Sequence, residues 1–279
     1  MMNLEEHKSK AIAFRAMHRG SKILVLPNAW DVASARIFED AGFGAIATTS
    51  AGIAFTLGYP DGQKISRTKM LARVARIAKA VRAPVTADVE GGYGDRPEDA
   101  ARTGREVIEA GAVGMNLEDS TGDSAHPLID LSLQVEKIRA VREAALKTGV
   151  LLVLNARTDV YLAEVGAADK RYDETVLRLV AFRDAGADCV FVPGLRDPTT
   201  IGRLAQDVKC PLNILGGPGS PAAPELEKLG VARVSVGSAP MRATLGLVTR
   251  IADELMKTGT YTSLDGGIPY ADANRMLGR

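Results

Sequence analysis

The sequence predicts an α/β fold of the (β/α)8 barrel class, and three observations support this prediction. A phrase recurs four times along the 279 residues: a helix end with an acid, then a glycine, then a short apolar strand. Strand-like and helix-like segments alternate, which implies parallel pairing with right-handed crossovers. About eight such units fit the length of the chain, and eight units close a barrel. The four copies of the phrase occupy residues 38–50, 108–120, 182–194 and 227–237.

The glycine of each copy is expected to end its helix in the left-handed conformation. The strand after it consists mostly of apolar or small residues, as expected for a parallel sheet that is covered on both faces. The spacing between the copies is too uneven for a solenoid repeat. Four further strands complete the set, at residues 22–28, 84–90, 150–159 and 211–217.

Helix-period patterns predict helices between the strands, at residues 68–82, 97–111 and 131–149. We predict one barrel domain over residues 1–279, with about 240–279 as a C-terminal helical extension at a subunit interface. A doubly wound sheet is the alternative architecture. It is weakened because no GxGxxG motif follows the first strand, where the sequence reads NAWD instead.

The composition argues against several classes of protein. The formal net charge is +1, which gives no sign of a nucleic-acid-binding surface. No apolar run is long enough to span a membrane, and the N-terminal segment lacks the apolar core of a secretion signal. Cys189 and Cys210 are too few for a disulfide framework and are expected to be core thiols of a cytoplasmic protein. His7 and His18 are expected on the surface.

Polar side chains gather where the predicted strands end, which is where a barrel of this kind carries its active site. Asp88 and Glu90 lie in the stretch ADVEGGYGD at the end of one strand. Glu118 ends the next strand, and Arg157 ends the one after it. Because side chains alternate along a strand, Asp88 and Glu90 are expected to point the same way. Clustered acids repel one another unless a cation lies between them, and Mg2+ prefers such oxygen ligands.

A structural interpretation stands beside each functional one. The acids fit solvated residues at the edge of a loop as well as metal ligands. Arg157 fits a structural ion pair with one of these acids as well as a fork for a carboxylate or phosphate. Thr49 and Ser50 fit a helix cap or polar turn as well as a ligand-binding loop.

Several stretches together resemble the isocitrate lyase/phosphoenolpyruvate mutase superfamily. They run in family order over roughly residues 20–240 and include TTSAGIAFTLGYPDG, PVTADVEGGYGD, AGAVGMNLEDS and LNARTDV. The resemblance implies a barrel whose last helix is exchanged between subunits, in a homodimer or in a homotetramer built from dimers. It also implies an enzyme that binds Mg2+, with Mn2+ as the alternative ion, and acts on a small α-oxo acid.

By position, the resemblance implies roles for individual residues. Asp88 and Glu90 match an Asp-x-Asp pair that holds Mg2+ largely through water, with glutamate here in place of the second aspartate. Glu118 and Asp61 match acids that support the metal and its waters. Arg157 matches the arginine that contacts the substrate and stabilises developing charge. The other matches are substrate-binding residues: Thr49, Ser50 and Ala51, whose loop amides hold the carboxylate, and Asn213.

The chain departs from these relatives in the segment after Glu118. Lyases of the superfamily carry a Lys-x-Cys-Gly-His loop there, and the mutase and phosphonopyruvate hydrolase branches carry lysine and asparagine. Residues 120–130 read STGDSAHPLID instead, and Gly194 replaces a glutamate of the lyases. His126 and Asp123 are the candidate proton donors on this loop.

We therefore predict a Mg2+-dependent lyase that cleaves or decarboxylates a small α-oxo acid through a pyruvate-like enolate. One alternative is P–C bond chemistry of the phosphonopyruvate hydrolase or phosphoenolpyruvate mutase type. The other alternative is a barrel that binds an oxo acid without catalysis.

Overall fold

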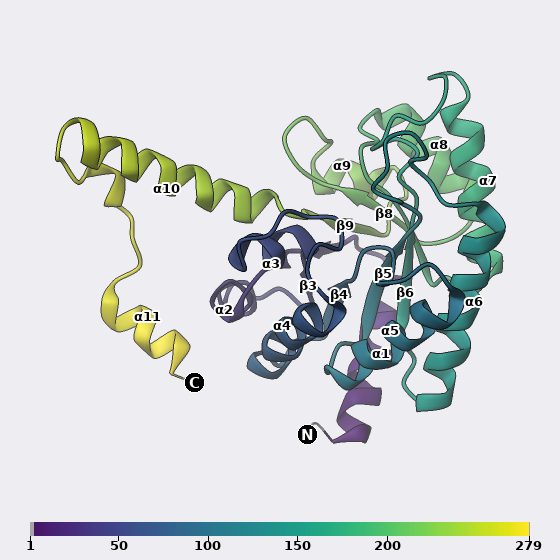
Figure 1. Cartoon of the computed structure of the whole chain (residues 1–279), viewed down its shortest axis with the longest axis horizontal. Helices are drawn as coiled ribbons and strands as arrows, with labels where there is room; N and C mark the ends of the chain where they lie inside the picture. Colours follow the sequence, from purple (N-terminus) through teal and green to yellow (C-terminus); the bar gives the residue numbers. More distant parts are fainter. Residues whose placement is uncertain (1–2, 279) are drawn as a thin grey trace.

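The fold is a parallel barrel surrounded by helices, seen in a computed structural model that describes residues 3–278 (Figure 1). Within these residues, nine strands form one sheet in the order β1-β9-β8-β7-β6-β5-β4-β3-β2. β1 and β2 follow one another in sequence yet stand at the two ends of this order, so the sheet comes round on itself. The prediction of a (β/α)8-type barrel is confirmed.

The first barrel strand is divided by Pro27, which has no amide hydrogen for the sheet. β1 pairs with β9, whereas β2 pairs with β3. This division explains why nine strands stand where about eight were expected. The strands are β1 Leu24–Leu26, β2 Asn28–Ala29, β3 Ile46–Thr48, β4 Val85–Asp88, β5 Gly114–Glu118, β6 Val153–Arg157, β7 Cys189–Val192, β8 Leu212–Leu215 and β9 Arg233–Ser235.

The helices surround the sheet and alternate with its strands (Figure 1). The three helices expected between strands are confirmed as α4, α5 and α6, with ends that differ from the prediction by at most two residues. The helices are α1 Leu4–Met17, α2 Val32–Asp40, α3 Ser50–Thr56, α4 Arg67–Ala80, α5 Pro97–Glu109, α6 Leu131–Thr148, α7 Arg171–Asp184, α8 Pro198–Val208, α9 Ala223–Lys228, α10 Ala239–Lys257, the 3-10 helix η1 Thr262–Leu264, and α11 Tyr270–Leu277.

The repeated glycine ends its helix in the left-handed region in all four copies of the phrase. The φ angles are +91° at Gly42, +90° at Gly111, +110° at Gly186 and +87° at Gly230. A residue with a Cβ atom reaches this region only at a cost, so the chain uses glycine each time it leaves a helix for the next strand.

α1 lies across the amino-terminal end of the barrel and buries one of its faces there. His7 Nε2 is 3.0 Å from the Ala112 carbonyl oxygen, and His18 Nδ1 is 2.9 Å from the Phe14 carbonyl oxygen. The expectation that both histidines are surface residues is wrong, because His7 is only 6% exposed and His18 only 3%. The sequence pattern of α1 alone did not show that its face would be covered by the barrel.

The lowered pKa of His18 predicts how the stability of the protein depends on pH. Burial, and then the charge of Arg233, lower the pKa of His18 from 6.5 to about 4. Below pH 6.5 His18 is protonated in the unfolded chain, but in the folded protein it stays neutral until about pH 4. The free energy of unfolding therefore decreases as the pH falls. We expect a loss of about 2 kcal/mol between pH 7 and pH 5.

Urea unfolding at both pH values measures this loss, and a His18→Gln variant is the comparison. The variant should lose less stability over the same interval, because its side chain does not titrate. An equal loss in both proteins would contradict the assignment.

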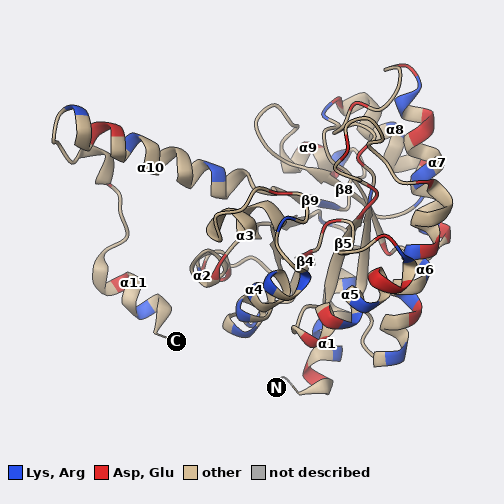
Figure 2. Cartoon of the chain, viewed as in Figure 1, with Lys and Arg blue, Asp and Glu red and all other residues tan. Residues whose placement is uncertain are grey.

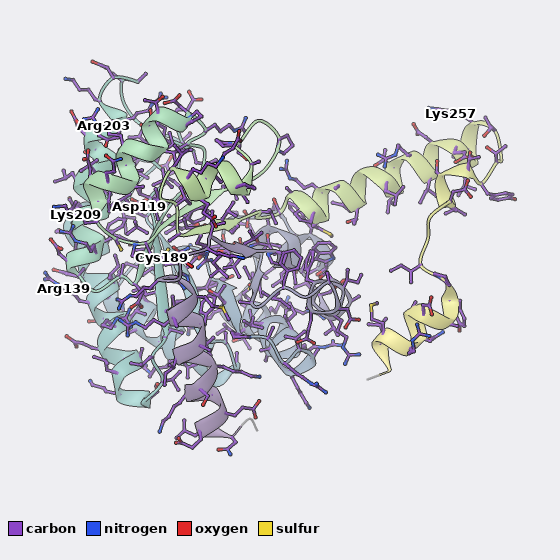
Figure 3. All side chains as sticks on the ribbon, turned by 180° about the vertical axis from the view of Figure 1, so that it is seen from behind. Asp119, Arg139, Cys189, Arg203, Lys209 and Lys257 are labelled. Atoms are coloured by element: carbon purple, nitrogen blue, oxygen red, sulfur yellow. The ribbon has the colours of Figure 1, made fainter. Side chains whose placement is uncertain are left out.

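The C-terminal segment leaves the barrel as an arm. α10 projects away from the barrel, and α11 turns back toward it (Figures 1 and 3). At the end of the arm, Arg36 Nη1 of α2 donates to the Met276 carbonyl oxygen at 2.6 Å. Several large apolar side chains of α10 are exposed in the single chain: Leu245, Leu247, Val248, Leu255 and Met256.

Basic and acidic residues are interspersed over most of the outer helices, whereas α4 carries lysine and arginine and no acidic residue (Figure 2). Within residues 3–278, no helix combines the length and apolar character needed to cross a membrane. Cys189 lies buried within the barrel strands and Cys210 is half-buried (Figure 3). Both thiols are free, and burial raises the pKa of each.

Candidate active site

Three neighbouring strands end in the charged residues singled out from the sequence. Asp88 is the last residue of β4, Glu118 of β5 and Arg157 of β6. Glu118 stands directly beside Arg157 in the β5–β6 register. These residues therefore share the carboxyl-terminal rim, where barrels of this class carry their chemistry.

Asp88 is held by hydrogen bonds from three directions. Its Oδ2 atom accepts from the amide and from the hydroxyl of Ser50, both at 3.0 Å. Its Oδ1 atom accepts from Asn116 Nδ2 at 3.4 Å, and its own amide donates to Thr48 Oγ1 at 2.9 Å. The carboxylate is thus oriented by the start of α3 and by the neighbouring strand.

Glu90 lies beyond the end of β4, and the expectation that it continues the strand alternation of Asp88 is wrong. Its φ angle is +53°, and Gln63 and Tyr93 are also left-handed, at +56° and +58°. Such angles are uncommon for residues other than glycine and carry strain. The turn is secured because Glu90 accepts from the Gln63 amide at 2.6 Å and from the Tyr93 hydroxyl at 3.3 Å. Tertiary contacts, not strand alternation, aim this carboxylate.

Arg157 lies between two acids. Its Nη1 atom is 2.6 Å from Glu118 Oε2, and its Nε and Nη2 atoms donate to the two oxygens of Asp159 at 2.6 and 2.8 Å. The guanidinium also lies over the Phe191 ring, 5.8 Å from its centroid. The ion pairs of the structural interpretation are therefore present, and they hold the guanidinium rigidly at the rim.

The site carries more negative than positive charge. Burial, then Asp61 and Asp88, raise the pKa of Glu90 to about 7. Burial also raises the pKa of Glu118, against the pull of Arg157. Burial lowers the pKa of Arg157, but Glu118 and Asp159 more than offset this, so the guanidinium remains charged. One arginine thus faces five carboxyl groups: Asp61, Asp88, Glu90, Glu118 and Asp159.

These residues fit a divalent cation that binds partly through water. The donor groups are carboxylates, which suit the hard Mg2+ ion, and their pKa values are raised by burial and then, at Glu90, by the neighbouring acids Asp61 and Asp88. Among the described residues, no three histidine, cysteine or acidic side chains converge closely enough to form a complete protein cage. Mg2+ usually keeps several waters and takes only one or two carboxylates, so a partial set of ligands suits it.

Asp61 and the start of α3 border the same cluster. Asp61 lies on an exposed loop, yet lost solvation and the charge of Asp88 raise the pKa of its carboxyl group. The Thr49 amide donates to the Ala29 carbonyl oxygen at 3.1 Å, and the Ser50 amide is used by Asp88. Of the three amides expected to hold a substrate carboxylate, Ala51 thus retains a free N–H in the described structure.

The remaining predicted residues lie apart from the carboxylates. Asn213 is fully buried in β8, and its Nδ2 atom donates to Ser235 Oγ at 3.2 Å. His126 and Asp123 are exposed on the loop after β5, with His126 Nδ1 3.4 Å from Asp123 Oδ2. That loop is closed by a bridge between Ser120 and Leu128, and neither candidate proton donor contacts a rim carboxylate.

Sequence reasoning assigned no role to three residues that shape the site. Asp159 holds the Arg157 fork, whereas Gln63 and Tyr93 hold Glu90. Asp159 follows Arg157 by two residues, so strand alternation was an available signal for it. No local pattern connects Gln63 with Glu90, because the two residues meet only through the fold.

No side chain fits at Gly194, the position where the resemblance to the lyases implies a glutamate. Its φ angle is +87°, and a Cβ atom would lie 2.9 Å from the Leu162 backbone. The backbone of the rim therefore requires glycine at this position.

We expect Gly194→Ala to lower the free energy of unfolding by about 2 to 4 kcal/mol, because φ strain and a backbone clash add. Gly166→Ala is the matched control, since Gly166 has a φ of +65° with no atom within 4 Å of an added Cβ. The control should cost only about 1 kcal/mol of φ strain. Chemical denaturation measures the free energy of unfolding of both variants. Equal losses in the two variants would contradict the backbone clash at Gly194.

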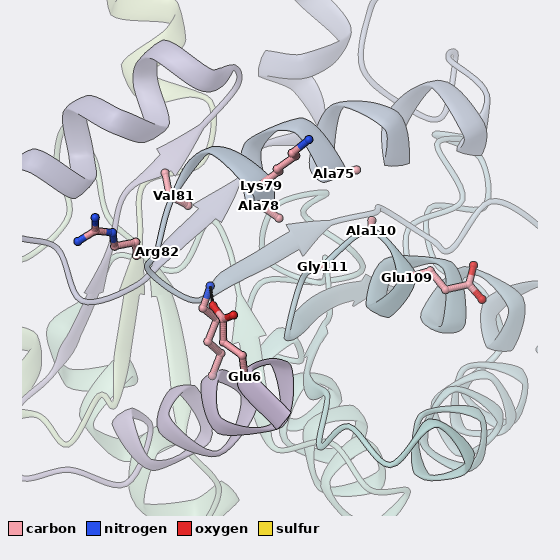
Figure 4. Close-up of a pocket in the computed structure, with 10 residues that line it drawn as sticks. Glu6, Ala75, Ala78, Lys79, Val81, Arg82, Glu109, Ala110 and Gly111 are labelled. Atoms are coloured by element: carbon pink, nitrogen blue, oxygen red, sulfur yellow. Dashed lines mark ion pairs between the residues drawn. The ribbon is translucent and has the colours of Figure 1, made fainter. Parts of the chain in front are cut away.

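A surface hollow of about 540 Å³ lies at the opposite end of the barrel (Figure 4). Residues of α1 and α4 line it together with the segments that lead into β4 and β5, and Glu6 pairs with Lys10 there at 3.3 Å. This end of a barrel serves stability, whereas catalysis uses the carboxyl ends of the strands. The carboxylate cluster, and not this hollow, is therefore the candidate active site.

Comparison with known proteins gives a consistent picture. Residues 14–256 match the phosphoenolpyruvate phosphomutase family. An uncharacterized protein of Mycobacterium tuberculosis is 37% identical over 266 residues, covering 95% of this chain and 96% of that protein. An oxaloacetate decarboxylase of Pseudomonas aeruginosa is 30% identical over 253 residues, covering 88% of this chain and 84% of the enzyme.

Solved structures agree with this picture. A protein of Burkholderia cenocepacia J2315, provisionally named a lyase/mutase, superposes with a TM-score of 0.93 at 41% identity, covering 99% of this chain and 98% of that one. Oxaloacetate acetylhydrolase in complex with oxalate gives 0.85 at 26% identity, covering 97% and 94%. Phosphonopyruvate hydrolase in complex with oxalate and Mg2+ gives 0.84 at 24% identity, covering 96% and 95%.

Proposed function

The chain belongs to the phosphoenolpyruvate phosphomutase family, a family of lyases and mutases, and we propose that it is a Mg2+-dependent lyase for a small α-oxo acid. The observation that carries this proposal is the cluster of carboxylates beside Arg157 at the ends of β4, β5 and β6. The similarity to oxaloacetate decarboxylase and oxaloacetate acetylhydrolase supports C–C bond cleavage as the reaction.

Asp88, Glu90, Glu118 and Asp61 would hold the metal and its waters, and Mn2+ would serve as an alternative ion. When bound, Mg2+ supplies a Lewis acid that polarises the oxo group and draws electrons away from the bond that breaks. The chain's own groups then determine how the substrate is held and where charge can develop.

Arg157 and the start of α3 supply the fixed positive potential for the reacting acid. We propose that the amide of Ala51, in the first turn of α3, donates to the substrate carboxylate. Arg157 is held by Asp159, so it stabilises negative charge without reorganising when the charge develops. Asn213 is buried below this level, and we propose that it supports the site without touching the substrate.

The proposed reaction on oxaloacetate breaks the bond between C3 and its carboxylate. Carbon dioxide leaves, and the electron pair remains on a pyruvate-like enolate. A proton added at C3 completes pyruvate, and His126 or Asp123 would donate it if their loop closes over the rim. Because both residues are exposed here, solvent is the other source of this proton.

The test is a set of Mg2+ titrations with oxaloacetate and other 3-substituted pyruvates. Mg2+ alone decarboxylates oxaloacetate slowly, so each rate is compared with a matched sample that contains metal but no protein. We expect one oxo acid to be turned over with Mg2+ and the rate to disappear with EDTA. Turnover of phosphonopyruvate instead would favour P–C chemistry. Binding of oxalate or pyruvate without turnover of any oxo acid would favour the non-catalytic barrel.

We also propose that the segment from about residue 240 is the subunit-interface extension of a single barrel domain. The apolar face of α10 has no cover within one chain, and exchange of this helix between two copies would bury it. A homodimer, or a homotetramer built from dimers, would cover the apolar face of α10 in this way. A cytoplasmic location is part of the same proposal, because the two free thiols suit a reducing compartment.

A further inference from the structure

Arg233 is a buried cation without a partner. It begins β9 and is 0% exposed, and none of its three guanidinium nitrogens has a hydrogen-bond partner among residues 3–278. Burial lowers the pKa of Arg233 to about 10, so the group still carries its charge near neutral pH. Other buried cations are paired: Lys137 donates to the Gly91 carbonyl oxygen at 2.6 Å, and Arg178 donates to Asp119 at 3.2 Å. An unpartnered buried guanidinium costs several kcal/mol, so something must satisfy it.

A chain of buried amides leads from the candidate active site into the barrel. Asn116 Nδ2 donates to Asp88 Oδ1 at 3.4 Å, and Asn155 Nδ2 donates to Asn116 Oδ1 at 2.7 Å. Asn155 is fully buried, and its Oδ1 atom receives no hydrogen bond in the described structure. The chain therefore orients Asp88 at one end and has an open acceptor at the other.

The sheet register and the electrostatic neighbours of Arg233 bear on whether its guanidinium is near that open end. In the sheet register Arg233 stands beside Asn213 of β8, whereas Asn155 stands beside Cys189 of β7, the next strand after β8. Burial raises the pKa of the Cys189 thiol, and the charge of Arg233 acts on the thiol in the opposite direction. The charge of Asp88 also acts on Arg233. The buried guanidinium of Arg233 thus has both Cys189 of β7 and Asp88 of β4 among its electrostatic neighbours.

The unsatisfied buried groups complement one another. Arg233 offers donors only, and Asn155 Oδ1 and Thr86 Oγ1 are buried acceptors without a partner. His18 Nε2 is a further buried atom without a partner, and it is an acceptor because Nδ1 faces the Phe14 carbonyl oxygen. Buried water characteristically bridges such groups, with about three hydrogen bonds per molecule.

We propose that Arg233 is a positioning residue for the candidate active site: through ordered water it donates to Asn155 and so stabilises the Asn155–Asn116 chain that orients Asp88. The role of Asp88 in metal binding rests on the function proposed above. The geometry of the chain does not depend on that function, because the hydrogen bonds and the unsatisfied atoms are properties of the folded barrel.

Metal binding by single and double variants tests the proposal. Arg233→Met removes the donors, and Asn155→Leu removes the acceptor. We expect each to weaken Mn2+ binding about tenfold, measured by electron paramagnetic resonance, and the double variant to lose no more than one of them. If the losses of Mn2+ affinity in the two single variants add up in the double variant, the two residues do not act through one another, and the proposal is overturned. Tighter Mn2+ binding to Arg233→Met would show that Arg233 only repels the ion, which also overturns the proposal.

Two controls separate positioning from a general loss of stability. Ile201→Ala creates a cavity in α8, far from the chain, and should leave Mn2+ affinity unchanged even as unfolding becomes easier. Crystal structures without metal give the second readout. The wild-type protein should show a water within hydrogen-bond distance of both Asn155 Oδ1 and the guanidinium, and Arg233→Met should show a reoriented Asp88.

The absence of that water, or an unchanged Asp88, would overturn the proposal even where a variant proves too unstable for metal titration. If the wild-type protein binds no Mn2+, the proposed function fails instead. The crystallographic comparison still decides the role of Arg233 in that case.

Discussion

Asp88→Asn is expected to reduce Mg2+-dependent turnover of the oxo acid by about 1,000-fold or more, because it removes one negative charge from the centre of the metal face. Asparagine has almost the same shape and can still accept from the Ser50 amide and hydroxyl, which now bond Asp88 at 3.0 Å, so only the long 3.4 Å hydrogen bond from Asn116 Nδ2 is lost. The fold should therefore survive. Steady-state rates over a range of Mg2+ concentrations measure the loss.

The matched control for this variant is Asp197→Asn. Asp197 caps α8 on the exposed surface, where its carboxylate accepts from the Thr200 amide and hydroxyl at 2.8 and 2.6 Å. Its replacement should cost about 1 kcal/mol of stability at most and leave turnover unchanged. Retention of Mg2+-dependent turnover in Asp88→Asn would refute the metal face proposed here.

Val248→Asp is expected to convert the assembly into monomers. Val248 lies with Leu245 and Leu255 on one stripe of α10, at the i, i+3 and i+10 spacing of a helix face, and all three are exposed in the single chain. A charge in the middle of this stripe would have to be buried without a partner if two copies pack there, which costs several kcal/mol. Light scattering coupled to size-exclusion chromatography gives the mass of each species.

Arg250→Asp is the control for the arm, since two residues along a helix turn the side chain to the opposite side. It carries the same introduced aspartate and should leave the mass of the assembly unchanged. If both variants keep the wild-type mass, or if the wild type is itself a monomer, the stripe is not a subunit interface.

The fold was largely predictable because its signals are local. The repeated acid–glycine–strand phrase marks where helices stop and strands begin, and Gly42, Gly111, Gly186 and Gly230 all adopt the left-handed conformation that this phrase requires. Strand ends were equally readable, which placed Asp88, Glu118 and Arg157 on one rim. Parallel strands bring their carboxyl ends to the same edge, so these residues meet in any closed barrel.

The contacts within the site were less predictable because they join segments distant in sequence. Glu90 was expected on the strand, but a left-handed turn held by Gln63 aims its carboxylate instead. His18 was expected on the surface, but the barrel covers its helix face. A helix carries no signal for which partner will bury it, since burial is decided by the packing of the whole chain.

The sequence by itself determined the order of strands and helices, the glycine stops and the rim on which the acids gather, because each depends on a few neighbouring residues. Tertiary structure alone decided the left-handed turn of Glu90, its contact with Gln63 and the buried guanidinium of Arg233. These features arise from register, closure and long-range packing, in which residues far apart in sequence compete for the same space and the same hydrogen bonds.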